Sequence, residues 1–325
     1  MSKLISKAIF LLLLVVLALG GCNGEAEDPH KIQIIATIYP LYEFAKEVGG
    51  EKVEVHLLLP PGSEAHSFDP KPSDIQKIER ARLVIYVGES LEPWMHDILE
   101  GVAPQDLSIL EAGDVAQLMY VDEEEHAEEE EEHEDEPAED DAEEEEHDHD
   151  GLDPHFWLDF DRDRKVVSEI ARQLSSIDPD NTNYYYQNSA KYQAKLLALD
   201  AQYSEELANC DTRTFIVNHD SFSYLAARYD LEQLAVFGIS PDREPNGKVI
   251  KEIIDLARSK NLTVVFFESL VNPGVAESIA NDIGGATLTL NPGENFDLDE
   301  IAREQQFLVA MGQNLENLKI GLKCR

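Results

Sequence analysis

The sequence predicts an α/β protein of two lobes, each built on a parallel sheet flanked by helices, with a long rigid helix joining the lobes. Three observations carry this prediction. Short β-branched runs alternate with helical stretches in both halves of the chain, the pattern of parallel sheets covered on both faces. A helical run of roughly 28 residues, about 40 Å long, separates the halves. The 325 residues are enough for two domains of ordinary size. We therefore expect a cleft between the lobes.

The first lobe is expected at residues 31–159. Its predicted strands are short aliphatic runs, and the first two are ended by the chain breakers Tyr39-Pro40 and Pro60-Pro61-Gly62. Strands are expected at residues 32–38, 53–59, 83–87 and 107–110, and helices at 41–48 and 72–81. Ligands of such sheets bind at the carboxyl ends of the strands. His66 lies on the loop after the second strand and is therefore a candidate site residue.

Residues 160–209 are predicted to form a helical linker region, and residues 210–325 a second α/β lobe. Asp178-Pro179 is typical of a helix start, with a cap followed by proline at the first helical position. Linker helices are expected at 162–176 and 179–207, one of them bridging the lobes as a stiff rod. The second lobe is expected to have strands at 214–218, 233–237, 262–267 and 286–290, and helices at 220–229, 248–259, 273–283 and 298–322.

The N-terminus has the pattern of an export signal. Lys3 and Lys7 precede an apolar run at residues 8–18, and LGGC at 19–22 resembles the lipobox of a lipoprotein. An ordinary secretory signal or a membrane anchor is the alternative, but the run is short for a spanning helix. We expect an extracytoplasmic protein that is lipid-anchored to the cell membrane, or periplasmic, with this arrangement: signal peptide 1–21, lipid on Cys22, polar tether 22–30.

The central acidic segment, residues 121–150, is predicted to be a disordered loop of the first lobe. It holds 21 Asp and Glu residues and no Lys or Arg. Like charges repel and little is apolar, so burial cannot repay the entropy of folding. Carboxylates and imidazoles are ligands that divalent metals accept, which predicts weak metal binding through four histidines: His126, His133, His147 and His149. The alternative is a solvated insertion that adds only solubility.

The formal net charge of the whole chain is -40. A chain this acidic is repelled by phosphate backbones, and the sequence holds no cluster of Lys and Arg that would make a local exception. Nucleic acid is therefore a poor candidate for a partner.

Cys210 and Cys324 remain once Cys22 is assigned to the lipid. Outside the cytoplasm a pair of cysteines usually forms a disulfide. Such a bond would tie the last residues of the chain to the start of the second lobe. A cysteine metal site is the alternative, but neither residue has a Cys or His neighbour at ligand spacing. A disulfide is the favoured prediction.

Four potential metal ligands fall on predicted loops or strand ends, two in each half of the chain: His66, His155, His219 and Glu294. Together they could close a tetrahedral site of three nitrogens and one oxygen, which suits zinc. Their separations are far too long for a local motif, and a lone histidine is more often a surface or core residue. Spacing alone does not select these four residues.

Four motifs together identify a known family: EAHSFDPKPSD at 64–74, DPHFWLD at 153–159, VNHDSFSY at 217–224 and NPGE at 291–294. With these motifs the chain resembles the solute-binding proteins of zinc and manganese ABC importers, in particular the high-affinity zinc-uptake type. The resemblance covers essentially the whole mature chain. A charged, His-rich loop ahead of the second motif is a feature of the zinc-specific members.

By this resemblance, His66, His155 and His219 are ligands of Zn2+. The third imidazole favours zinc, because manganese members have a carboxylate at the position of His219. For the fourth ligand, Glu294 matches the glutamate of other zinc members and is preferred to water or Asn291. Many members have Asp where this chain has Asn291, and an amide is a weak substitute for a carboxylate. Copper and nickel would also bind such a site.

The resemblance implies a monomer that captures Zn2+ outside the cytoplasm, delivers it to a membrane permease and its ATPase, and catalyses nothing. Other classes stay open. A zinc hydrolase would keep one metal position for water and need a general base, for which Glu64 and Glu268 are candidates. A manganese-binding member or a cell-adhesion protein of the same family is the third interpretation.

Overall fold

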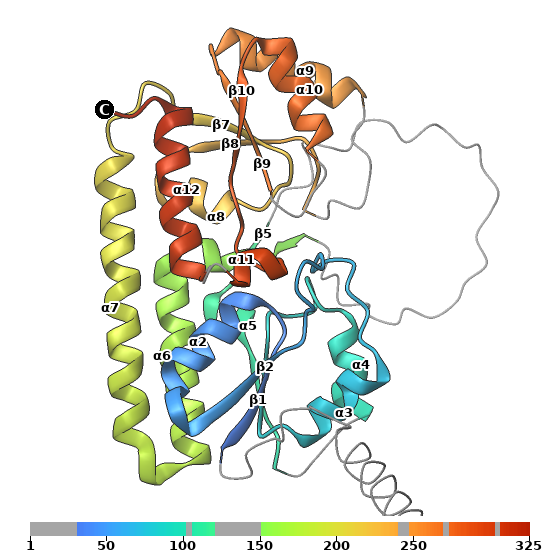
Figure 1. The fold of residues 1–325 in the computed structure, drawn as a ribbon, viewed down its shortest axis with the longest axis vertical. Coiled ribbons are helices and arrows are strands. Elements are labelled where there is room, and N and C mark those ends of the chain that lie inside the picture. Colours follow the sequence, from blue (N-terminus) through green and yellow to red (C-terminus); the bar gives the residue numbers. More distant parts are fainter. Residues whose placement is uncertain (1–30, 102–105, 121–150, 240–246, 269–272, 303–305) are drawn as a thin grey trace, which may run out of the picture. The chain divides into compact units, whose positions relative to one another are not determined.

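The first lobe is a parallel sheet with the strand order β2-β1-β3-β4 (Figure 1). The computed structural model describes residues 31–101, 106–120, 151–239, 247–268, 273–302 and 306–325. All four residues of β3 are buried, as expected for a central strand covered on both faces. The strands are β1 (Ile32–Ala36), β2 (Val53–Leu57), β3 (Leu83–Tyr86) and β4 (Ser108–Glu111). The helices are α2 (Tyr39–Gly49), the 3-10 turn η1 (Gly50–Lys52), α3 (Pro72–Arg80), α4 (Trp94–Gly101) and α5 (Ala112–Ala116).

The second lobe repeats the arrangement, with the parallel strand order β10-β9-β7-β8. Its strands are β7 (Thr214–Val217), β8 (Glu232–Ala235), β9 (Val264–Phe267) and β10 (Ala286–Thr289). Its helices are α8 (Ser223–Arg228), α9 (Gly247–Ser259), α10 (Gly274–Ile283), α11 (Leu298–Ala302) and α12 (Phe307–Leu322). Helices α9 and α10 pack on the sheet through a separate apolar cluster that includes Ile216, Ile253 and Ile279.

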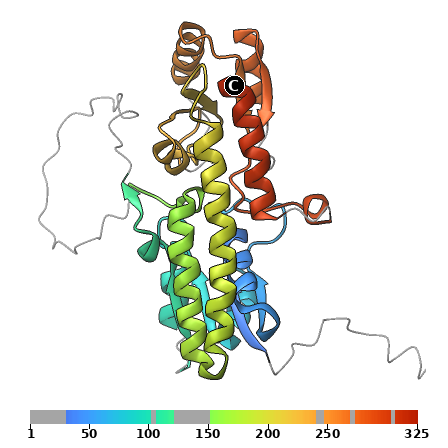
Figure 2. The same cartoon turned by 90° about the vertical axis from the view of Figure 1, so that its left-hand side faces the viewer.

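Two long helices pack against each other, α6 (Phe160–Ile177) and α7 (Thr182–Glu206), joined through the 3-10 turn η4 (Pro179–Asn181). Helix α6 lies beside the first lobe, and the longer α7 runs alongside both lobes (Figures 1 and 2). Helix α7 has 25 residues, which makes it about 37 Å long. It packs against α2 of the first lobe and α12 of the second (Figures 1 and 2). The predicted fold class is therefore confirmed. Among the described helices, none combines the length and the apolar character that a membrane crossing requires.

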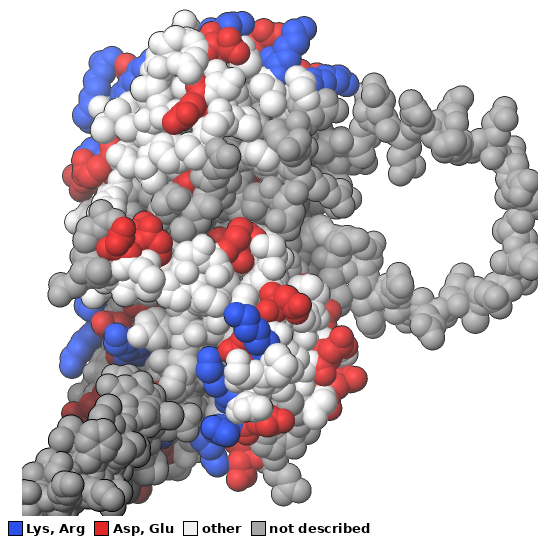
Figure 3. Space-filling model, turned by 45° about the vertical axis from the view of Figure 1, so that its right-hand side comes forward, with Lys and Arg blue, Asp and Glu red and all other residues white. Residues whose placement is uncertain are grey.

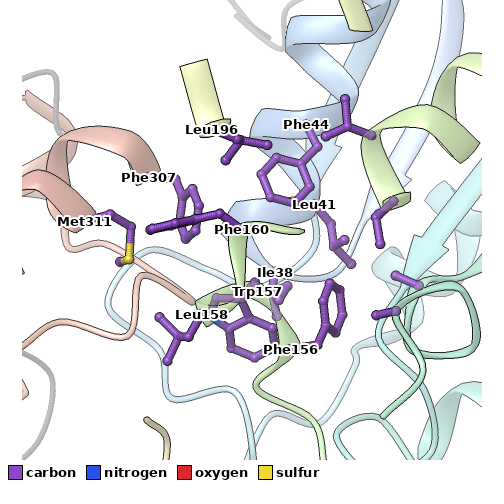
Figure 4. Close-up of a cluster of buried hydrophobic side chains, with 14 of the residues drawn as sticks. Ile38, Leu41, Phe44, Phe156, Trp157, Leu158, Phe160, Leu196, Phe307 and Met311 are labelled. Atoms are coloured by element: carbon purple, nitrogen blue, oxygen red, sulfur yellow. The ribbon is translucent and has the colours of Figure 1, made fainter. Parts of the chain in front are cut away.

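One hydrophobic core continues through both lobes (Figure 4). Phe44 of α2 lies edge-on to Phe307 of α12, with ring centroids 5.7 Å apart. Phe160, at the start of α6, belongs to the same cluster. The buried residues thus come from both ends and the middle of the chain, and they hold the two sheets in a fixed relation.

The predicted single terminal helix over residues 298–322 is wrong. Helix α11 ends at Ala302, and α12 begins at Phe307 after Gln306 adopts an extended conformation. The reason is a contact with α2: Glu43 Oε2 accepts a hydrogen bond from the Phe307 N–H (2.9 Å). The first N–H groups of a helix have no partner inside it, so a buried carboxylate at this point favours a new helix start.

Other helices are also misplaced or missed, among them α5 (Ala112–Ala116), which was not predicted. Helix α2 starts at Tyr39, two residues before the predicted start, because Pro40 fits the first turn of a helix. Helix α4 is not predicted at all, although its residue Met95 is fully buried.

The predicted disulfide between Cys210 and Cys324 is confirmed. It connects the end of α12 with the segment between α7 and β7. Backbone hydrogen bonds support the same junction: Asp211 N–H donates to the Lys323 carbonyl (3.2 Å), and Arg325 N–H donates to the Asn209 carbonyl (3.1 Å).

We expect loss of this disulfide to lower the free energy of unfolding. The two cysteines are 114 residues apart in sequence, and a cross-link over a loop of this length is worth up to ~4–5 kcal/mol in the chain-entropy model. Urea unfolding of the Cys210→Ser/Cys324→Ser variant, compared with wild type, measures the effect. Wild type treated with a reductant should match the variant, and an unchanged unfolding midpoint would contradict the expectation.

Helix α6 carries a fully buried carboxylate that forms no hydrogen bond with the described residues. Asp163 of α6 is fully buried, and neither of its carboxyl oxygens has a hydrogen-bond partner within the described part of the chain. Burial, followed by the nearby charge of Asp159, holds the pKa of Asp163 well above its usual range, and Arg228 only partly opposes this. Ionising such a group costs stability, because desolvation is not compensated.

We expect Asp163→Asn to stabilise the protein near neutral pH. Because the pKa is raised on folding, the stability that Asp163 contributes is complete below its unfolded pKa and is lost as pH rises through the folded pKa. The advantage of the variant should therefore shrink as the pH falls toward about 4. Urea unfolding of the metal-free proteins across this pH range is the measurement. Asp161→Asn, at a half-exposed position of the same helix where the carboxylate pairs with Arg164, is the control. A stability difference that does not change with pH would refute the expectation.

Candidate metal centre

His66 lies on the loop between β2 and α3, and a neighbouring carboxylate shapes this loop. Glu64 accepts hydrogen bonds from the backbone N–H groups of His66 (3.0 Å) and Ser67 (2.8 Å). These two bonds use both oxygens of Glu64. The backbone around His66 is therefore fixed by a side chain only two residues away.

His155 follows a two-stranded antiparallel sheet formed by β5 (Met119–Tyr120) and β6 (Leu152–Asp153). Asp153 Oδ1 lies 2.7 Å from His155 Nδ1 and accepts the His155 backbone N–H at 2.9 Å. Both side chains are fully buried. A carboxylate at Nδ1 orients the ring and leaves Nε2 as the nitrogen available to a metal.

His219 stands two residues after β7, at the carboxyl end of the second sheet. Its Nδ1 lies 3.0 Å from Glu268 Oε1, which also accepts a hydrogen bond from Ser221 Oγ (3.2 Å). Glu268 follows β9, the neighbouring strand, so two parallel strands deliver the histidine and its carboxylate to the same edge. His219 Nε2 lies 2.5 Å from the Ile239 carbonyl oxygen.

The side chains of the three histidines lie close together. Among the described residues, their ligand atoms form a group in which all lie within 4.8 Å of one another. Nε2 of His66 is 3.3 Å from Nε2 of His155, and the ring centroids of the three pairs are 5.0 to 5.4 Å apart. Such an arrangement can place three nitrogens on one metal ion.

Burial decides the protonation of two of these rings. Burial, followed by the charges of His155 and His219, lowers the pKa of His66 to about 2. Burial likewise holds the pKa of His155 well below its usual range. Burial also opposes charge on His219, but the charge and hydrogen bond of Glu268 outweigh it and raise the pKa to about 10. A metal would therefore meet two neutral rings and displace one proton from the third.

Glu294 lies beside the three histidines without joining their 4.8 Å group. It is 4% exposed, and its Oε2 has no hydrogen-bond partner among the described residues. The Ala65 backbone N–H donates to its carboxylate, and its charge acts on His219. Burial, followed by the charge of Glu268, raises the pKa of Glu294 to about 8.

Asn291, the other candidate for a fourth ligand, has its side chain engaged elsewhere. Its Oδ1 accepts a hydrogen bond from Gly293 N–H (2.7 Å), and its Nδ2 lies 3.4 Å from Glu300 Oε1. Gly293 has φ +77°, and a Cβ there would lie 3.0 Å from Phe307 Cδ2, so a larger residue would be strained. The glycine lets the chain turn tightly between Asn291 and Glu294.

The sequence identified Glu268 only as a possible base and assigned no role to Asp153. The structure places each against the Nδ1 atom of a histidine, at 3.0 and 2.7 Å. The Asp153-Pro154-His155 spacing is a local signal for the pair of Asp153 and His155. The pair of Glu268 and His219 has no such signal, because 49 residues separate its members. Several predicted site residues lie outside the described residues: Cys22, His126, His133, His147 and His149.

Residues 34–321 match the family model described as zinc-uptake complex component A, periplasmic (ZnuA). The chain belongs to this ZnuA family. The high-affinity zinc uptake system protein ZnuA of Bacillus subtilis is 35% identical over 312 residues, covering 95% of this chain and 94% of the relative. The resemblance expected from the four sequence motifs is thereby confirmed.

Two other proteins that are similar to this chain come from streptococci. The zinc-binding lipoprotein AdcA of Streptococcus pneumoniae is 32% identical over 96% of this chain, which spans only 60% of AdcA. The Zn(II)-bound ZnuA-like domain of AdcA superposes with a TM-score of 0.73 at 28% identity, covering 90% of this chain and 99% of that domain. The laminin-binding protein Lmb of Streptococcus agalactiae, described as having adhesin and metal-transporting activity, gives a TM-score of 0.74 at 28% identity, covering 90% of this chain and 99% of Lmb.

Proposed function

We propose that this protein captures Zn2+ outside the cytoplasm and delivers it to the permease and ATPase of an ABC importer. One observation carries the proposal: three histidines from distant parts of the chain bring their ligand atoms within 4.8 Å of one another in a ZnuA-family fold. Zinc is cargo here, held without chemical change. The relatives named for zinc uptake and zinc binding support this choice of metal.

The proposed ligands are His66, His155, His219 and Glu294. Three imidazole nitrogens and one carboxylate oxygen match the tetrahedral preference of zinc. Glu294 is favoured over Asn291 because its buried Oε2 has no partner among the described residues, whereas the Asn291 side chain is already hydrogen-bonded. A divalent ion would compensate the buried charge of Glu294. Manganese is disfavoured, because His219 occupies a position where manganese members have a carboxylate.

Binding without catalysis fits the surroundings of the two carboxylates that a hydrolase would use. Glu64 accepts two backbone N–H groups, and Glu268 is hydrogen-bonded to His219 and Ser221. Each is therefore occupied in shaping or orienting the site. A general base must instead be free to take a proton from a metal-bound water. These contacts favour a solute-binding protein over a hydrolase.

The proposed setting is the outer face of a cell membrane, with the protein working as a lipid-anchored monomer. The lipobox-like sequence before Cys22 supports a signal peptide at 1–21 and a tether at 22–30. The proposed domains after the tether are the lobes at 31–159 and 210–325 and the linker region at 160–209. On the face shown in Figure 3, basic and acidic side chains are interspersed over both lobes, a distribution that does not favour nucleic acid. Whether this protein shares the adhesin activity named for Lmb is tested by measuring its binding to immobilised laminin.

Replacing any one of the three histidines with Ala should weaken zinc binding by orders of magnitude. Each substitution removes one of only four proposed metal bonds, while Glu294→Gln should do less damage because three imidazoles remain. Zinc titration in competition with a chromophoric chelator gives the dissociation constants. His96→Ala, an exposed histidine on α4, is the matched control and should bind as wild type does. Wild-type affinity in a His66, His155 or His219 variant would remove that residue from the site.

The acidic segment should add weak zinc sites and speed capture. Because its composition predicts no folded structure, its affinity should be far below that of the histidine cluster. Deletion of residues 122–150 should leave one tight site, remove the weak ones, and slow zinc association more at low salt than at high salt. Stoichiometry by titration and association rates by stopped flow test this. Unchanged stoichiometry together with an unchanged salt dependence would mean that the segment only adds solubility.

A further inference from the structure

The segment that carries Glu294 passes from the second lobe to the first lobe between Asn291 and Pro292. Up to Asn291 the hydrogen bonds go to the second lobe. Leu290 N–H donates to the Phe267 carbonyl (2.9 Å), and Asn291 N–H donates to Asn314 Oδ1 (2.9 Å). After Asn291, the backbone carbonyl groups of Pro292, Glu294 and Phe296 accept hydrogen bonds from earlier parts of the chain.

From Pro292 to Phe296, every second carbonyl group accepts a hydrogen bond from the first lobe, including its DPHFWLD segment. Trp157 Nε1 donates to the Pro292 carbonyl (2.9 Å). Tyr39 N–H donates to the Glu294 carbonyl (2.8 Å), and Gly62 N–H donates to the Phe296 carbonyl (3.0 Å).

Asn295 makes the connection to the loop that precedes His66. It is 1% exposed, and its Nδ2 donates to two carbonyl oxygens, those of Pro60 (2.7 Å) and Ser63 (2.8 Å). Its Oδ1 accepts the Phe296 backbone N–H (2.9 Å). The amide therefore uses both of its donor hydrogens to join the loop of His66 to the segment of Glu294.

We propose that Asn295 is a positioning residue for zinc binding. It locks Glu294 and the loop of His66 into one unit with the first lobe, so that the proposed fourth ligand keeps its place beside the histidines. The Ala65 N–H, which donates to the Glu294 carboxylate, lies inside this same unit. This inference rests on the proposed function, because it assigns Asn295 to the zinc site.

Asparagine is the side chain that this position requires. The two carbonyl oxygens need two donors on one neutral group, which a primary amide supplies. Alanine would leave both buried carbonyls without these donors, and aspartate would set a negative charge against two carbonyl oxygens and next to Glu294. Serine offers one donor and should therefore have an intermediate effect.

The experiment compares Asn295→Ala with Asn317→Ala. Asn317 Nδ2 donates to the Thr289 carbonyl (2.8 Å), so its loss removes a similar amide bond from strand β10, away from the histidines. We expect Asn295→Ala to weaken zinc binding about tenfold or more, as removal of groups that orient metal ligands commonly does, and Asn317→Ala to leave zinc affinity unchanged. Unfolding in urea separates these effects from loss of stability.

A double-mutant cycle with Glu294→Gln shows whether Asn295 acts through that ligand. If it does, the combined variant loses less affinity than the product of the two single losses. Multiplicative losses, or wild-type affinity in folded Asn295→Ala, would overturn the proposal. If the alanine variant does not fold, Asn295→Ser takes its place in the same cycle. Absence of tight zinc binding in wild type itself would contradict the proposed function, which separates the two failures.

Discussion

The shared hydrophobic core fixes the distance between the loops that hold the metal-binding side chains, and the rest of the structure depends on it. Phe44 and Phe307 meet in this core from opposite ends of the sequence. Trp157 belongs to it as well: its ring packs against His155, with centroids 5.3 Å apart, and its indole N–H holds the Pro292 carbonyl. Loops can present ligands accurately only when the elements beneath them do not shift. A close-packed core that includes both lobes meets that condition.

Within this frame, the site carries more acidic than basic groups. Burial raises the pKa of Asp153 to about 7, with the His155 backbone N–H lowering it only in part. Burial also raises the pKa of Glu294, and Glu268 favours the protonated form of His219 in the absence of metal. A divalent ion takes the place of those protons, because it compensates the same carboxylates and accepts the imidazole lone pairs. Asp153 and Glu268 therefore both orient the rings and balance the charge of a bound ion.

The strands of the two four-stranded sheets were predictable because their residues carry local signals, whereas β5 and β6 were not predicted. Residues 32–36 and 83–86 are β-branched or aliphatic runs, and the structure makes strands of both. The break between α11 and α12 has no such signal, since the carboxylate of Glu43 that caps Phe307 lies 264 residues away. Similarly, nothing in the spacing of the three histidines joins them. They were grouped by the four family motifs, and the structure brings them within 4.8 Å.

The positions of His155 and Glu294 share one property that no local pattern reveals. Each lies on a segment that contacts both lobes. Tyr224 of the second lobe donates to the Asp153 carbonyl (2.7 Å), two residues before His155, while Met119 of the first lobe donates to the same hydroxyl (2.7 Å). Glu294 lies just beyond the point where its segment leaves the second lobe. A segment anchored on two sides has little conformational freedom to lose when it binds an ion, so the fold places these ligands where ordering them costs least.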